Sequence, residues 1–179
     1  MPNFTYRFHV NAPVTAVSAF HHDTSVLKTL TPPPIFAQIH RFDPLGDGAV
    51  AEFTLWFGPL PVRWQAIHSE VSERGFTDTQ VSGPLQSWQH RHRFIPVSEE
   101  RTRIEERIEY SHHDGRRGLL SRLLFAKPGL YLLFTARQMI TRWHLEYSPE
   151  QRKTAVRAAL LTATITGLLS LLLARKNKK

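Results

Sequence analysis

The stretch GPLQSWQHRHRF, residues 83–94, alternates two kinds of side chain once its turn-forming opening is past. Its even positions carry Trp88, His90, His92 and Phe94, and polar or charged residues stand between them. Successive side chains of a β-strand point to opposite faces of a sheet. The stretch therefore predicts a strand with one aromatic and imidazole face and one solvent face.

Further strands are predicted on both sides of this one, at 35–42, 48–57, 62–72, 76–82 and 102–110, with an earlier strand at 4–10. Short segments rich in glycine, proline and acidic residues separate the later six, which is typical of an antiparallel meander and not of alternating strands and helices. Two short helices are predicted after the first strand, one beginning near Pro13 and one capped by Asp23.

A long helix is predicted from Gly118 to Tyr147, with a kink at Pro128, because proline removes a backbone N–H and crowds the preceding turn. The chain has 179 residues and is 41% hydrophobic, which suits one ordinary domain with an appendage. We therefore expect an α+β fold, with a domain over residues 1–147 and a tail over residues 148–179.

Composition excludes several functional classes. The chain has no cysteine, so disulfides, thiolate metal sites and cysteine nucleophiles are excluded. Its formal net charge of +8 lies mostly in the tail, because residues 149–179 hold seven basic residues and one acidic residue. The domain itself carries only a small excess of positive charge, and we expect no nucleic-acid partner.

The tail contains seventeen consecutive uncharged residues, 158–174, with basic residues on either side. A helix of this length rises about 25 Å, slightly less than a hydrocarbon layer of about 30 Å. The length becomes adequate if the span begins near Val156 and Arg157 reaches toward the headgroups. We expect a membrane anchor at about 156–174; a helix packed on the domain or in a dimer seam is the alternative.

The first residues show no secretory signal, because no basic run precedes an apolar stretch. We therefore expect a cytoplasmic domain that a single C-terminal helix attaches to the membrane.

Turn lengths predict which residues face each other across the sheet, namely Ser72 with Phe76, Ser82 with Trp88, and Phe94 with Thr102. This register puts four polar side chains in one inward row, His68, Gln80, His90 and Glu106. An unpartnered polar group in an apolar interior costs a few kcal/mol, so such a row must be hydrogen-bonded internally, hydrated or in contact with a ligand.

Aromatic side chains are interleaved with this polar row, and an apolar cavity with a few orienting polar groups is how small-molecule pockets are usually built. The candidate ligand-binding residues are Phe53, Leu55, Trp64, His68, Gln80, Trp88, His90, His92, Glu106 and Tyr110. The alternative is a satisfied polar network that braces a solid core.

Two kinds of chemistry are open to the inward polar residues. His90 and His92, two apart on one strand face, can present two imidazoles to a metal ion, and Glu106 could add a carboxylate. No distinctive third-ligand motif accompanies them, so we predict no metal and no cofactor. His90 and Glu106 could instead form a general acid/base pair for cyclisation or dehydration, and they are the candidate catalytic residues.

The order of elements resembles the START and polyketide-cyclase superfamily (SRPBCC), particularly its cyclase/dehydrase-like bacterial members. The stretches that carry the resemblance are FHVNAPVTAVSAFHHD, LKTLTPPP, GPLPVRWQAIH, GFTDTQVSGPLQSWQHRHRF and TRIEERIEY, within Phe4 to Tyr147. The resemblance implies a helix-grip fold, in which a seven-stranded antiparallel sheet wraps around a long C-terminal helix. It also implies a cavity between sheet and helix for lipids, polyketides, hormones or other hydrophobic molecules, and catalysis in only some members.

The leading hypothesis is a non-enzymatic protein that binds, and by extension transfers, a hydrophobic or lipid-like small molecule at a membrane surface. A cyclase or dehydratase that uses His90 and Glu106 is the first alternative. A membrane-tethered regulatory protein without a ligand is the second.

Overall fold

The computed structural model describes residues 3–176, apart from the side chains of residues 117, 165 and 167–176. The chain divides into two units, Met1–Glu146 and Tyr147–Lys179. The first unit contains a seven-stranded sheet in the order β1-β7-β6-β5-β4-β3-β2, and every neighbouring pair is antiparallel. These findings confirm the α+β class and the seven-stranded antiparallel sheet.

Each strand begins and ends within three residues of its predicted bounds. Their bounds are β1 (Asn3–Val10), β2 (Ile35–Phe42), β3 (Val50–Phe57), β4 (Leu60–Ser72), β5 (Gly75–Ser82), β6 (Ser87–Ser98) and β7 (Arg101–Ser111). The helices are α1 (Val14–His22), α2 (Val26–Thr29), α3 (Arg117–Leu124), α4 (Lys127–Glu146) and α5 (Pro149–Lys176). Pro13 occupies the N-cap of α1 as expected, but Ser25, not Asp23, occupies that of α2.

The inward face of β6 is the one that alternation predicts. Trp88, His90, His92 and Phe94 are all buried, and the residues between them are at least partly accessible. The adjoining β7 buries its own even positions, Ile104, Glu106, Ile108 and Tyr110. Two histidines and a glutamate therefore lie on the same inner face as the largest aromatic side chains.

The predicted register is wrong in all three of these strand pairs, by one residue beside the β4–β5 turn and by two residues along most of each ladder. Ser72 pairs with Gly75 and not with Phe76, and Phe94 pairs with Ile104 and not with Thr102. Across β5 and β6, His90 faces Asp78 and not Gln80. For β4–β5 and β6–β7 the physical reason is that the turns are tighter than assumed and that bulges interrupt the ladders near them. For β5–β6 the pairing ends earlier than assumed, at Thr79 and Gln89.

Gly75 shows why the β4–β5 turn can be so tight. Its φ of +130° is one that residues with a Cβ rarely adopt, and a Cβ there would lie 1.9 Å from the carbonyl oxygen of His92. Glycine therefore lets β5 begin directly against β6. This close approach helps to set the register that brings Asp78 opposite His90.

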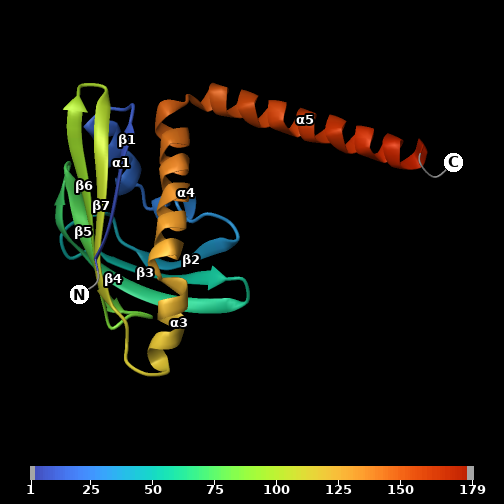
Figure 1. Ribbon diagram of the computed structural model, residues 1–179. Helices are drawn as coiled ribbons and strands as arrows, with labels where there is room; N and C mark the ends of the chain where they lie inside the picture. Colours follow the sequence, from blue (N-terminus) through green and yellow to red (C-terminus); the bar gives the residue numbers. More distant parts are fainter. Residues whose placement is uncertain (1–2, 177–179) are drawn as a thin grey trace. The chain divides into compact units, whose positions relative to one another are not determined.

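The predicted long helix is in fact two helices, α3 and α4, which meet at 45°. Pro128 lies at the second position of α4, where its missing N–H is tolerated, so the chain breaks before the proline and does not kink at it. Figure 1 shows α4 running over the inner face of the curved sheet. Leu130 and Phe134 anchor it there, each 1% exposed.

Aromatic contacts fix α4 against the sheet. The Phe134 ring lies 5.5 Å from that of Phe4 and 5.4 Å from that of His90, centroid to centroid, and Tyr6 contacts both Phe134 and Tyr131. The Tyr6 hydroxyl also donates a hydrogen bond to Gln138 of α4. Helix and sheet thus enclose a common core.

The second unit is the helix α5. Within its described part, the apolar side chains of Val156, Leu160 and Leu161 are between 51% and 64% exposed. In the part of the chain that the structure describes, no single helix is long and apolar enough to span a membrane. The bent pair α3–α4 meets the same criteria of length and composition when its two helices are taken together. Nine of the nineteen side chains of the anchor predicted at about 156–174, those of residues 165 and 167–174, lie outside the described residues.

Candidate functional site

A cavity of about 130 Å³ lies in the first unit, between the inner face of the sheet and α4. Aromatic rings dominate its wall, contributed by Phe42, Phe53, Trp64, Phe76, Trp88, Phe125 and Phe134. Two small residues, Ala51 and Ala66, face each other across β3 and β4 and also line it. Side chains of this size leave room above the sheet that the surrounding rings do not fill.

The structure brings seven of the ten predicted ligand-binding residues to this cavity. They are Phe53, Leu55, Trp64, His68, Trp88, His90 and His92. The other three lie elsewhere. The amide of Gln80 donates a 2.7 Å hydrogen bond to the Leu85 carbonyl, so it braces the loop between β5 and β6. Tyr110 packs beside Trp88, and Glu106 lies behind the two histidines of β6.

Three polar residues that are not among the ten candidates also line the cavity. Asp78 stands at an inward position of β5, and the register error concealed that it lies beside His90. His21 comes from α1 and Arg137 from α4. Alternation along the strand could have identified Asp78, whereas no local signal places a helical side chain over a particular strand position.

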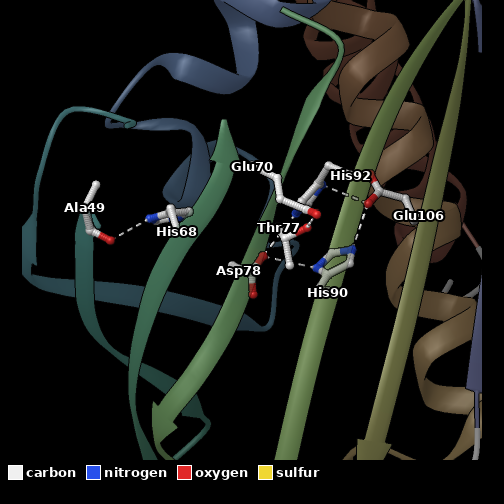
Figure 2. A network of polar contacts seen from close by, with 8 residues as sticks. All are labelled: Ala49, His68, Glu70, Thr77, Asp78, His90, His92 and Glu106. Atoms are coloured by element: carbon white, nitrogen blue, oxygen red, sulfur yellow. Dashed lines mark hydrogen bonds and ion pairs between the residues drawn. The ribbon is translucent and has the colours of Figure 1, made fainter. Parts of the chain in front are cut away.

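Asp78, His90, His92 and Glu106 form a closed cycle of contacts, which we call the His–carboxylate cluster (Figure 2). His90 Nε2 lies 2.7 Å from Glu106 Oε2, and His92 Nδ1 lies 2.8 Å from the same oxygen. On the other side, His92 Nε2 lies 3.1 Å and His90 Nδ1 lies 3.5 Å from Asp78 Oδ2. Because β6 is flanked by β5 and β7, the two imidazoles stand between two carboxylates.

Both carboxylates of the cluster are charged. Burial alone raises the pKa of Glu106, but the charge of His92 and hydrogen bonds from both imidazoles outweigh burial and hold this pKa well below its usual range. Burial likewise opposes ionisation of Asp78, and the neighbouring imidazoles still lower the pKa of Asp78. Neither group is therefore a proton donor near neutral pH.

The two imidazoles of the cluster differ in protonation. Burial favours the neutral form of His92, but the charge of Glu106 and the hydrogen bond to Asp78 raise its pKa to about 9. Burial and the neighbouring charge of His92 lower the pKa of His90. One charged and one neutral imidazole thus lie side by side, with ring centroids 3.9 Å apart.

Arg137 and His21 extend the polar wall. Among the described residues Arg137 Nε is buried without a hydrogen-bond partner, and its guanidinium carbon lies 5.3 Å above the Phe134 ring. Burial lowers the pKa of Arg137 and lowers that of His21 to about 4. His21 Nδ1 donates a 2.8 Å hydrogen bond to the Val17 carbonyl, which leaves its Nε2 without a proton.

The chain matches no family model and no curated protein. Solved structures do resemble it. Protein CV1439 from Chromobacterium violaceum is 12% identical, with a TM-score of 0.66 over 83% of this chain and 100% of that one. Norcoclaurine synthase from Thalictrum flavum, in complex with dopamine and hydroxybenzaldehyde, is 15% identical, with a TM-score of 0.60 over 82% of this chain and 88% of that one.

A third similar structure is the ZhuI aromatase/cyclase from Streptomyces sp. R1128. It is 14% identical, with a TM-score of 0.58 over 79% of this chain and 94% of that one. At these identities the similarity establishes architecture and not activity. The chain therefore has the helix-grip fold of the SRPBCC-type polyketide cyclases and norcoclaurine synthase, as the resemblance in its sequence implied.

Proposed function

We propose that this protein binds a small hydrophobic molecule, with an apolar group the size of one aromatic ring held in the cavity. The volume of about 130 Å³ supports a guest of this size, because an engineered apolar cavity of roughly 150 Å³ binds benzene. Most small-molecule pockets are larger, about 300–1,000 Å³, so a long lipid chain fits the cavity poorly. The ring-sized guest is a narrower class than the lipid-like molecule expected from the sequence.

The polar groups on the cavity wall suggest what else the guest carries. His68, Asp78 and Arg137 lie among the rings that line the cavity. A few polar groups in an aromatic pocket fix the orientation of a ligand more than they add affinity. We infer a guest with a polar substituent on its ring; the dopamine and hydroxybenzaldehyde of the similar Thalictrum flavum structure are molecules of this kind.

The observation that carries the proposal is the pairing of Ala51 and Ala66 beneath a ring of aromatic side chains. Binding is favoured over acid/base catalysis by His90 and Glu106 because of where Glu106 lies. Its carboxylate accepts contacts from both imidazoles and does not line the cavity. It is therefore placed to hold the histidines and not to exchange protons with a guest.

Filling the cavity tests the proposal. We expect single-ring probes such as 4-hydroxybenzaldehyde and phenol to bind the wild-type protein, measured by ligand-observed NMR and calorimetry. Ala66→Leu should weaken this binding at least tenfold, because the added carbons occupy the space of the guest. Ala159→Leu, an exposed position in the second unit, is the matched control and should bind as the wild type does.

Two results would contradict this proposal. One is the absence of probe binding to the wild type together with no co-purifying compound in native mass spectrometry. The other is unchanged probe affinity in a folded Ala66→Leu protein.

We also propose that the second unit holds the domain at a membrane surface. The exposed apolar side chains of Val156, Leu160 and Leu161 support this, since exposed apolar surface marks sites of interaction with a membrane or a protein. The basic residues on either side of 158–174 suit anionic headgroups. Attachment to the membrane surface would bring a hydrophobic guest of the domain close to the lipid phase in which it dissolves.

A further inference from the structure

We propose that Asp78, His90 and His92 bind a divalent transition-metal ion such as Zn²⁺ or Fe²⁺, and that Glu106 orients the two imidazole ligands. The sequence predicted no metal because no distinctive third-ligand motif accompanies the two histidines, and Glu106 was the carboxylate considered beside them. The structure supplies a different carboxylate, that of Asp78, and gives Glu106 another role. Two histidines and one carboxylate are a common donor set for both ions.

The three ligand groups are spaced closely enough to bind one ion. Asp78 Oδ2 lies 3.1 Å from His92 Nε2 and 3.5 Å from His90 Nδ1. Bonds of about 2.0–2.1 Å to one ion hold two ligand atoms about 3.0 Å apart in octahedral and about 3.4 Å apart in tetrahedral geometry. One donor atom from each of the three residues lies within 4.8 Å of the other two.

Glu106 contacts both histidines on the side opposite Asp78. Its Oε2 lies 2.7 Å from His90 Nε2 and 2.8 Å from His92 Nδ1, the ring nitrogens that face away from Asp78. A carboxylate that accepts the N–H of a metal-binding histidine sets the tautomer and orients the ring. Glu106 is hydrogen-bonded to His90 in this way and lies close to His92, so the other ring nitrogen of each histidine lies on the side of Asp78 (Figure 2).

The two imidazoles have too few N–H groups to fill every contact of the cluster when both are neutral. The cycle contains four close nitrogen–oxygen contacts, and a neutral imidazole has a single N–H. Without an ion, His92 Nε2 donates a hydrogen bond to Asp78. A divalent ion would take the place of that proton, and Asp78, His90 and His92 would then each offer it one lone pair.

The proposed metal ligands lie on the wall of the cavity. Asp78, His90 and His92 all line the cavity, whereas Glu106 lies behind them. A metal held by three protein ligands keeps coordination positions open, and here those positions face the space proposed for the guest. The ion would therefore be available to a polar substituent of that guest. Metal binding itself needs no guest, so it can be tested independently of the proposed function.

Metal content of the full chain without a polyhistidine tag tests the inference. After EDTA treatment and dialysis against Zn²⁺, we expect about one zinc per chain by elemental mass spectrometry. Asp78→Asn, His90→Gln and His92→Gln should each weaken Zn²⁺ binding at least 100-fold in calorimetry. Glu106→Gln should weaken it between about 10-fold and 100-fold, as loss of an orienting partner does. With Co²⁺, the visible absorption bands should change in Asp78→Asn.

His9→Gln is the matched control, because His9 is a half-buried histidine of β1 outside the cluster, and it should bind zinc as the wild type does. Circular dichroism in EDTA identifies variants that fail to fold, and Glu106→Gln keeps the test decisive if a ligand variant does so. The inference is overturned if the wild type binds clearly less than one zinc. It is equally overturned if folded Asp78→Asn and Glu106→Gln both bind zinc with unchanged affinity.

Discussion

Single residues in this protein have their chemistry set by neighbours on adjacent strands. His90 and His92 are two positions apart on one strand, yet the pKa of one is lowered and that of the other is raised to about 9. The difference arises because a buried cluster with two carboxylates stabilises a positive charge, and a charge on one imidazole disfavours a charge on the next. The sequence shows the spacing of the histidines but not this difference.

The raised pKa of His92 predicts a loss of stability at alkaline pH. The folded pKa of about 9 lies above the ordinary value of 6.5. The stabilisation is therefore complete below pH 6.5 and disappears as the pH rises through 9. For EDTA-treated wild-type protein, the free energy of unfolding in urea should fall over this interval, by at most about 1.4 kcal/mol per pH unit for one proton. His92→Gln should lack this slope, and an equal slope in both proteins would contradict the assignment.

At the scale of elements, α4 is held by a narrow stripe of side chains. Leu130 is 1% exposed in the core, whereas Leu132, half a turn away, is 73% exposed. Helical periodicity gives such alternating environments to residues close in sequence. The stability that α4 contributes therefore comes from a few positions, and these also close the cavity.

Leu130→Ala and Leu132→Ala form a matched pair that tests this packing. Removing the buried Leu130 side chain should lower the free energy of unfolding by about 2–5 kcal/mol, because it leaves a void in the core. The same change at Leu132 should stay within about 0.5 kcal/mol of the wild type. Chemical denaturation followed by circular dichroism measures both, and similar losses would show that α4 is not seated as described.

At the scale of the whole molecule, the chain consists of a domain that contains the entire cavity and a helical unit of different character. The boundary falls between Glu146 and Tyr147. Every residue that lines the cavity lies on the domain side of that boundary. Binding and membrane attachment should therefore be separable.

A chain that ends at Tyr147 tests this separation. It should keep the melting temperature of the domain, within a few degrees, and the affinity for single-ring probes, because no part of the cavity is removed. In flotation with vesicles of anionic phospholipid, the full chain should rise with the vesicles and the shortened chain should not. Equal flotation of both proteins would contradict the proposed role of the second unit.

The sequence by itself determined the fold class, the seven strands and the face of the sheet to which Trp88, His90 and Glu106 belong. These features depend on alternation along one strand, which is a local property. The tertiary structure alone decided that Asp78 faces His90, and that His21 and Arg137 reach the cavity. Register follows from tight turns and bulges that shift pairing by two residues without changing the face, and helix docking depends on contacts between residues distant in sequence. The inward residues could thus be predicted from the sequence, whereas their partners could not.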